Sequence, residues 1–214
     1  LGYRCFDCRN NVRYTADNKV VYTAAAVGIV LDPENKQQSF FTQHAEDVVS
    51  LALHPQKRIV ATGQMAQRGK AKMIEIYVWK TDSKEVLSCL KGFHRRAIRQ
   101  LDFSPDGKFL LSVGQDEDNS CAIYDWKAKR VVATAKVNKE KVMDARWNSN
   151  STFVTAGIKH IKFWTLNGSN LKSSAGLMGS GRAFEPQLCI AFAFETNTCV
   201  TGTSQGNVIT WNGR

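Results

Sequence analysis

Four short hydrophobic runs in this chain each carry an aromatic residue, and these residues recur at a near-constant interval. They are Trp79, Tyr124, Trp164 and Trp211, so the successive steps are 45, 40 and 47 residues. An interval of this size is the period of a four-stranded propeller blade. Between the aromatic residues, short hydrophobic stretches alternate with turn residues, which is the pattern of antiparallel strands. The sequence therefore predicts an all-β fold of repeated blades, a β-propeller.

Each repeat is expected to hold four strands separated by polar turns. The turn at Pro105-Asp106-Gly107 is the strongest, because proline presets φ and glycine tolerates positive φ. An earlier unit lacks the aromatic residue, since Val30 and Leu31 stand in its place. The expected strands are 11–15, 20–24, 27–31 and 39–42; 48–53, 59–63, 74–79 and 86–90; 98–103, 109–113, 121–124 and 131–135; 142–147, 153–156, 161–164 and one near Leu171; and 188–194, 199–202 and 208–211. We thus predict about five blades, the last without its fourth strand.

The chain is expected to divide into a motif with the first blade, residues 1–43, and four repeats, residues 44–214. A single blade cannot bury both faces of its sheet and must stack on neighbours. A seven-bladed ring would need roughly 300 residues, whereas this chain has 214 and opens on Leu1. We therefore expect it to be part of a larger polypeptide whose natural N-terminus lies upstream.

Charge and hydropathy limit the partners and the compartment. The net charge is +10, which favours an acidic partner at low salt. The longest nearly apolar run, 20–31, is too short to cross a bilayer as a helix, so no membrane span is expected. Four of the six cysteines lie inside strand-like runs, where a free thiol acts as a small apolar residue. This usage favours a reducing, intracellular compartment.

The turns and strand ends resemble WD repeats. His44 and His94 precede the first strands of two repeats, but the Trp-Asp pair of that family is degenerate, as in Trp79-Lys80. In WD repeats a His, a Ser, an Asp and the Trp form a hydrogen-bonded tetrad, and we expect the second repeat to come closest to it. The expected blade markers are His44, Trp79, His94, Ser112, Asp116, Tyr124, Trp164 and Trp211.

A more specific resemblance lies at the N-terminus. The stretch 2–11, which reads Gly-Tyr-Arg-Cys-Phe-Asp-Cys-Arg-Asn-Asn, and the small-residue strand 23–28 resemble the HELP motif of the echinoderm microtubule-associated protein-like (EMAP-like) family. Segments 61–64 and 157–166 are also similar to that family, whereas Cys5 and the loop 65–72 depart from its pattern. The motif residues are Gly2, Tyr3, Arg4, Asp7, Arg9, Asn10 and Asn11.

This resemblance implies both an architecture and a partner. In that family, the HELP segment and WD repeats build a tandem β-propeller, and members associate with microtubules or axonemes. The chain would then be a non-enzymatic scaffold of the cytoplasmic cytoskeleton or of a cilium, which binds tubulin, microtubules or axonemal proteins through its loops. The alternative is a general WD-repeat platform for an acidic protein, RNA or an anionic lipid, although no RNA-binding motif is present.

Basic residues gather in the loops that open on one rim of the predicted propeller. In blade topology, the loops that lead into the first and third strands of each blade share a rim. We expect this rim to meet an acidic partner, and the alternative is the ordinary solvated surface of a basic protein. Its cations are Arg68, Lys70, Lys72, Lys91, Arg95, Arg96, Lys136, Lys139, Lys141 and Lys159.

Other candidate sites have a structural interpretation that we prefer. Cys5 and Cys8 have the spacing of a zinc or redox pair, but no second pair accompanies them. The histidines stand at equivalent turns or strand edges, where hydrogen bonding within a blade accounts for them. The glycine-rich stretch 176–182 lacks the Lys-Ser/Thr ending of a phosphate loop. The tryptophans recur at strand ends, which favours core packing over base stacking. We predict no catalytic residue, cofactor or metal site.

Overall fold

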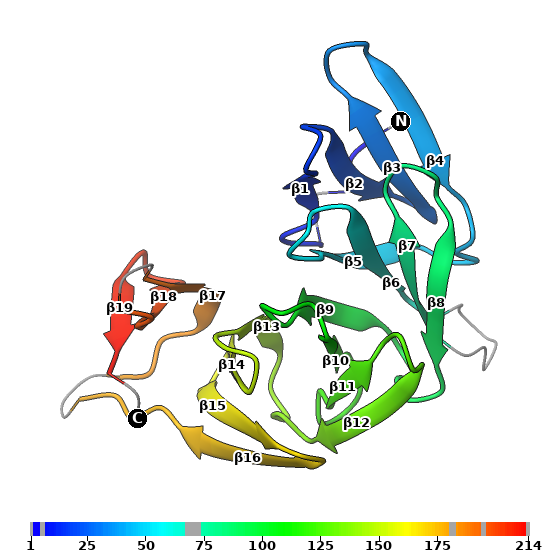
Figure 1. The fold of residues 1–214 in the computed structure, drawn as a ribbon. Helices are drawn as coiled ribbons and strands as arrows, with labels where there is room; N and C mark the ends of the chain where they lie inside the picture. The colour runs from blue at the N-terminus through cyan, green and yellow to red at the C-terminus, as the bar shows by residue number, and fades with distance from the viewer. Residues whose placement is uncertain (1, 5–6, 67–73, 180–182, 194–195, 213–214) are drawn as a thin grey trace.

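The computed structural model describes residues 2–4, 7–66, 74–179, 183–193 and 196–212. Within these ranges all regular structure is β-strand, arranged in five antiparallel sheets. Figure 1 shows the sheets following one another around an arc, with the last strand of each four-stranded sheet on the outside. The all-β propeller prediction is confirmed, and the described residues contain no helix long and apolar enough to span a membrane.

The strands of every sheet pair in chain order. The first sheet holds β1 (Val12–Tyr14), β2 (Val20–Ala24), β3 (Val27–Asp32) and β4 (Gln37–Phe41). The second holds β5 (Val48–Leu53), β6 (Ile59–Gln64), β7 (Glu75–Lys80) and β8 (Val86–Lys91). The third holds β9 (Ile98–Phe103), β10 (Phe109–Gly114), β11 (Cys121–Asp125) and β12 (Arg130–Ala135). The fourth holds β13 (Val142–Trp147), β14 (Thr152–Gly157), β15 (His160–Asn167) and β16 (Asn170–Ala175), and the last holds β17 (Gln187–Phe192), β18 (Cys199–Thr203) and β19 (Val208–Trp211).

The strand register confirms that Tyr124, not the nearby Trp126, continues the aromatic series. Val60 lies opposite Trp79, and Leu110 lies opposite Tyr124 in the same way. In the first sheet, the equivalent position opposite Val21 holds Val30. The register therefore places one aromatic residue at the same point of four sheets and an aliphatic residue in the fifth.

The hydrophobic core lies between neighbouring sheets. Each of the four main clusters of buried side chains draws on two successive sheets, so every sheet buries a face against the next. Trp79, for example, is fully buried and packs with Val30 and Phe41 of the first sheet. The repeats are thus stabilised through their interfaces, as expected for stacked blades.

The loops that lead into first and third strands meet at one rim. Backbone hydrogen bonds join them directly: the Ala66 amide donates to the Arg96 carbonyl at 2.6 Å, and the Asn138 amide donates to the Asp118 carbonyl at 3.0 Å. The first strands β5, β9, β13 and β17 contact one another in succession. Their N-terminal ends therefore surround the axis of the arc at this rim.

Candidate functional site

The N-terminal motif is held by its own polar side chains. The Arg4 guanidinium contacts both carboxylate oxygens of Asp7 at 2.7 Å and also pairs with Asp47, in the loop before β5. The Tyr3 hydroxyl donates to Asn11 Oδ1 at 2.6 Å, and Asn11 Nδ2 donates to the Arg4 carbonyl at 2.6 Å. The hydrogen bonds from Arg4 hold the pKa of Asp7 below its usual range. The two ends of the motif are thereby tied together.

The motif docks on first strands of three other sheets. The buried Cys8 packs with Val49 of β5 and with Ala97, just before β9. Arg99 of β9 donates to the Asp7 carbonyl at 3.4 Å, and Arg9 donates to the carbonyl of Leu188 in β17 at 3.3 Å. The motif residues therefore lie at the inner edge of the arc, where they join sheets that are far apart in sequence.

Two further motif residues have local roles or none. Asn10 has a φ of 55°, in the left-handed region that asparagine tolerates better than most residues. Gly2 is exposed, and a Cβ there would meet no neighbouring atom within 4 Å, so packing does not explain its glycine.

Burial governs the chemistry of Cys8. It raises the pKa of the thiol to about 11, so the group stays protonated at neutral pH. Its possible partner Cys5 lies outside the described residues. In the part of the chain that the structure describes, no group of three or more His, Cys, Asp or Glu side chains could hold a metal ion.

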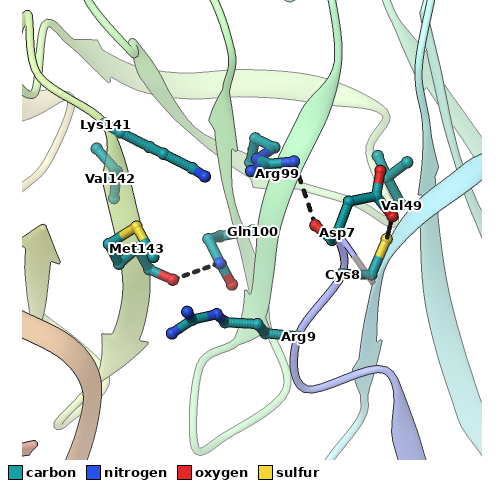
Figure 2. A pocket seen from close by; sticks show the side chains of 9 residues that line it. All are labelled: Asp7, Cys8, Arg9, Val49, Arg99, Gln100, Lys141, Val142 and Met143. Atoms are coloured by element: carbon teal, nitrogen blue, oxygen red, sulfur yellow. Dashed lines mark hydrogen bonds between the residues drawn. The ribbon is translucent and has the colours of Figure 1, made fainter. Parts of the chain in front are cut away.

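A pocket of about 220 Å³ opens beside the motif at the N-terminal ends of the first strands. Segments 7–9, 99–100 and 141–143 line it together with Val49. Figure 2 shows the Lys141 and Arg9 side chains reaching from opposite sides toward the space beside Gln100. The Gln100 amide is fixed by a hydrogen bond from Nε2 to the Met143 carbonyl at 2.8 Å. We call this space the axial pocket.

Positive charge dominates the axial pocket. Arg9, Arg99 and Lys141 line it, and its one carboxylate, that of Asp7, is already bound by Arg4. Lys141 is exposed as a residue, but partial burial of its amino group lowers its pKa, and the positive charges of Arg99 and Arg9 lower it further. The three cations therefore repel one another in a site that a negative group would stabilise.

The basic rim residues that can be placed are all exposed. Arg68, Lys70 and Lys72 lie outside the described residues. Of the others, three cations pair with acidic neighbours on the same rim: Arg96 with Glu117 at 3.7 Å, Lys136 with Asp118 at 2.8 Å, and Lys159 with Glu140 at 2.8 Å. Among described residues, Lys91, Arg95, Lys139 and Lys141 have no carboxylate within 4.0 Å. The positive character of the rim therefore rests on fewer residues than its composition suggests.

The most complete hydrogen-bonded network of the tetrad type lies in the first repeat, which forms the sheet β5–β8, and not in the second repeat, β9–β12, as expected. Trp79 Nε1 donates to Thr62 Oγ1 at 3.0 Å, and His44 Nε2 lies 2.7 Å from the same hydroxyl. His44 Nδ1 lies 2.9 Å from Gln64 Oε1. Thr62 and Gln64 thus take the places that Ser and Asp hold in the tetrad of WD repeats.

The second repeat makes only part of such a network. His94 Nε2 lies 2.6 Å from Ser112 Oγ, but His94 Nδ1 has no partner among the described residues. Asp116 does not reach it, because its carboxylate accepts hydrogen bonds from the amide and hydroxyl of Ser120, at 2.8 and 3.2 Å. The third strand of this repeat, β11, supplies Tyr124, which lacks the indole N–H of a tryptophan.

The remaining markers are packed inside the sheets. Trp164 Nε1 donates to Thr155 Oγ1 at 2.9 Å, and Trp211 Nε1 donates to Thr201 Oγ1 at 2.8 Å. Both indoles are buried, so neither presents a face for stacking on a base. Burial lowers the pKa of His44, His94 and His160 to about 4, which keeps these imidazoles neutral at pH 7.

The axial pocket was not predicted from the sequence. Lys141 was assigned to the rim and Arg9 to the motif, but Arg99 and Gln100 were assigned to no site. The available signal was two adjacent polar residues, Arg99-Gln100, near the start of a strand whose apolar positions are Ile98, Leu101 and Phe103. Polar residues at the inner edge of stacked sheets line the space around the axis.

Comparison with known proteins gives consistent matches along the chain. Residues 37–214 match the model described as "Echinoderm microtubule-associated protein first beta-propeller", and residues 1–29 match the HELP motif. "Echinoderm microtubule-associated protein-like 1" of Homo sapiens is 33% identical over 98% of this chain and 27% of its own length. "Echinoderm microtubule-associated protein-like 2" of Homo sapiens is 32% identical, with 98% and 33% covered. The "77 kDa echinoderm microtubule-associated protein" of Strongylocentrotus purpuratus is 30% identical, with 98% and 31% covered.

The chain spans only about 27 to 33% of the length of these relatives. The propeller model nevertheless covers most of its residues, and the HELP match coincides with the N-terminal motif described above. This chain belongs to the echinoderm microtubule-associated protein family.

Proposed function

We propose that this segment is a non-enzymatic scaffold of the microtubule cytoskeleton, which binds tubulin, microtubules or proteins attached to them through its rim loops. Its relatives are named as microtubule-associated proteins. The observation that carries the proposal for this chain is the set of exposed rim cations without a neighbouring carboxylate, Lys91, Arg95, Lys139 and Lys141. We place its action in the cytoplasm, with an axonemal setting as a narrower version of the same proposal.

The architecture supports a binding role. The sheets hold the described rim loops at both ends, which limits the backbone entropy that these loops lose on binding. We propose that residues 1–43 act as the motif and first blade, and that residues 44–214 add four repeats.

Microtubule co-sedimentation of the full protein that carries this segment tests the proposal. The variant Arg95→Glu/Arg96→Glu/Lys141→Glu is expected to bind at least about tenfold more weakly at low salt, because charge complementarity steers such complexes. The matched control, Arg58→Glu/Lys127→Glu/Lys172→Glu, changes the charge equally at exposed cations away from that rim. Its affinity should change much less.

Two outcomes would contradict this proposal. One is unchanged co-sedimentation by a folded rim variant. The other is binding to RNA but not to microtubules when both are offered in competition, which would favour the general WD-repeat platform. Loss of microtubule binding at high salt would support the basic rim, since exposed charges are screened by salt.

A further inference from the structure

We propose that the axial pocket is a binding site for a glutamate side chain of an acidic peptide, held by Arg9, Arg99 and Lys141. The inference rests on the proposed function only in so far as that peptide belongs to the microtubule partner. The site itself is defined by the geometry of this chain.

The charge of the pocket favours a negative ligand. Three cations from three separate parts of the chain line the pocket. Partial burial lowers the pKa of Lys141, and the charges of Arg99 and Arg9 add to this effect. Asp7 offsets only part of this positive charge, because it is a single carboxylate and both of its oxygens accept hydrogen bonds from Arg4. A carboxylate that enters the pocket would replace this repulsion with charge-assisted hydrogen bonds.

The walls favour a carboxylate on an aliphatic stem over a bare anion. Val49, Val142 and Met143 line the pocket beside the cations, so part of its surface is apolar. The two methylene groups of glutamate can cover such a surface, whereas inorganic phosphate has no apolar part. A volume of about 220 Å³ has room for one such side chain and not for a folded element.

The surroundings favour a peptide over a free amino acid. Lys139 lies two residues before Lys141 in the same loop, is exposed, and has no carboxylate within 4.0 Å among the described residues. The pocket opens at the same rim. An extended acidic segment could therefore place one side chain in the pocket and a neighbouring carboxylate near Lys139.

Fluorescence anisotropy with a labelled octaglutamate peptide tests this inference in the full protein. Arg9→Gln/Arg99→Gln should weaken binding at least about tenfold, because it removes two of the three converging charges. Lys141→Gln should weaken it about threefold to tenfold by the same argument. Among the described residues, the Lys141 side chain makes no hydrogen bond or ion pair, so this variant remains informative if the double variant does not fold, which circular dichroism would show.

The matched control is Lys136→Gln/Lys159→Gln, which removes two charges from the same rim that are already paired with Asp118 and Glu140. It should change peptide affinity less than about twofold. Equal weakening by the control and the pocket variants would overturn the inference in favour of unspecific attraction to the rim. Wild-type affinity in Lys141→Gln and in the folded double variant would overturn it as well.

Competition separates the possible ligands. Inorganic phosphate should displace the peptide only at concentrations far above those of free octaglutamate. Displacement at equal concentration would identify a small-anion site and overturn the peptide assignment. Loss of peptide binding in Arg9→Gln/Arg99→Gln with unchanged microtubule co-sedimentation would support the pocket while showing that it does not serve the proposed microtubule contact. If the wild-type protein bound the peptide but did not bind microtubules, this result would contradict the proposed function and would leave the pocket inference intact.

Discussion

The first two sheets each carry a threonine hydroxyl at an equivalent position, but only the hydroxyl of the second sheet has hydrogen-bond partners. Thr62 in β6 and Thr23 in β2 occupy equivalent positions, two residues after the one that faces Trp79 in β7 or Val30 in β3. Thr62 joins the indole to His44, whereas the buried Thr23 hydroxyl has no partner among the described residues. The difference follows from two residues: valine has no N–H to donate, and no histidine of this chain precedes β1 to take the place of His44.

The first sheet instead packs against the indole ring that the second sheet contributes. The Trp79 ring stacks on Phe41 of β4, with ring centroids 4.5 Å apart and planes 2° from parallel. Gly28 of β3 leaves the space for this ring, since a Cβ there would lie 2.8 Å from Trp79 Cζ2. The comparison teaches that the packing unit is the interface between sheets, so a sheet with an aliphatic residue at the marker position can still bury the aromatic marker of its neighbour.

Acid should affect the second sheet more than the first. The pKa of His44, His94 and His160 falls from its ordinary 6.5 to about 4 on folding, because burial disfavours the charged form. Between pH 4 and pH 6.5 the unfolded chain binds more protons than the folded chain. The stability that the neutral histidines contribute is therefore fully present above pH 6.5 and is lost as the pH falls toward 4. At pH 5 the loss is about 2 kcal/mol per histidine.

Urea unfolding at pH 7 and pH 5 measures this loss, and hydrogen exchange locates it. The described part of β1–β4 contains no histidine, so its amides should remain protected longer at pH 5 than those of β5–β8. His160→Leu should recover about 2 kcal/mol of the loss, because neither ring nitrogen of His160 has a partner in the described structure. Equal acid sensitivity of wild type and His160→Leu would refute the assignment.

Removal of the shared indole should destabilise both sheets at once. Trp79→Ala leaves a cavity between the sheets and should cost about 3–5 kcal/mol of unfolding free energy. Trp79→Phe keeps a ring against Phe41 but removes the N–H donor to Thr62, so it should cost less, about 1–3 kcal/mol. Chemical unfolding followed by circular dichroism measures both. A loss below about 1 kcal/mol for Trp79→Ala would mean that the interface does not depend on this ring.

A methyl group added to the first sheet should test the same contact between the two sheets. Gly28→Ala crowds Trp79 Cζ2 and should cost about 1–3 kcal/mol. In a Trp79→Phe background this cost should shrink, because the phenyl ring is smaller. Gly2→Ala is the matched control, since its Cβ would meet no atom within 4 Å, and it should leave the thermal midpoint unchanged. Additive effects of Gly28→Ala and Trp79→Phe would argue against direct contact.

Local pattern predicted the fold well and the site poorly, for a physical reason. The aromatic interval and the turns are properties of neighbouring residues, and they led to the correct alignment of Tyr124 with Trp79. The axial pocket depends on how successive sheets are arranged around the axis. This arrangement brings Arg9, Arg99 and Lys141 together from distant segments. The partial tetrad of the second repeat was missed for a different reason: Asp116 accepts hydrogen bonds from Ser120, four residues further along the same loop, instead of one from His94.

The two threonines give the smallest but most direct test of the comparison. Thr62→Val should cost about 1–3 kcal/mol, because it leaves the buried N–H of Trp79 and one nitrogen of His44 without a partner. Thr23→Val should leave stability unchanged or raise it by up to about 1 kcal/mol, because it removes a buried hydroxyl that already lacks one. Urea midpoints of the two variants provide the measurement. If Thr23→Val destabilised the protein as much as Thr62→Val, the Thr23 hydroxyl would have a partner in solution, and the difference between the two sheets would lie in their packing alone.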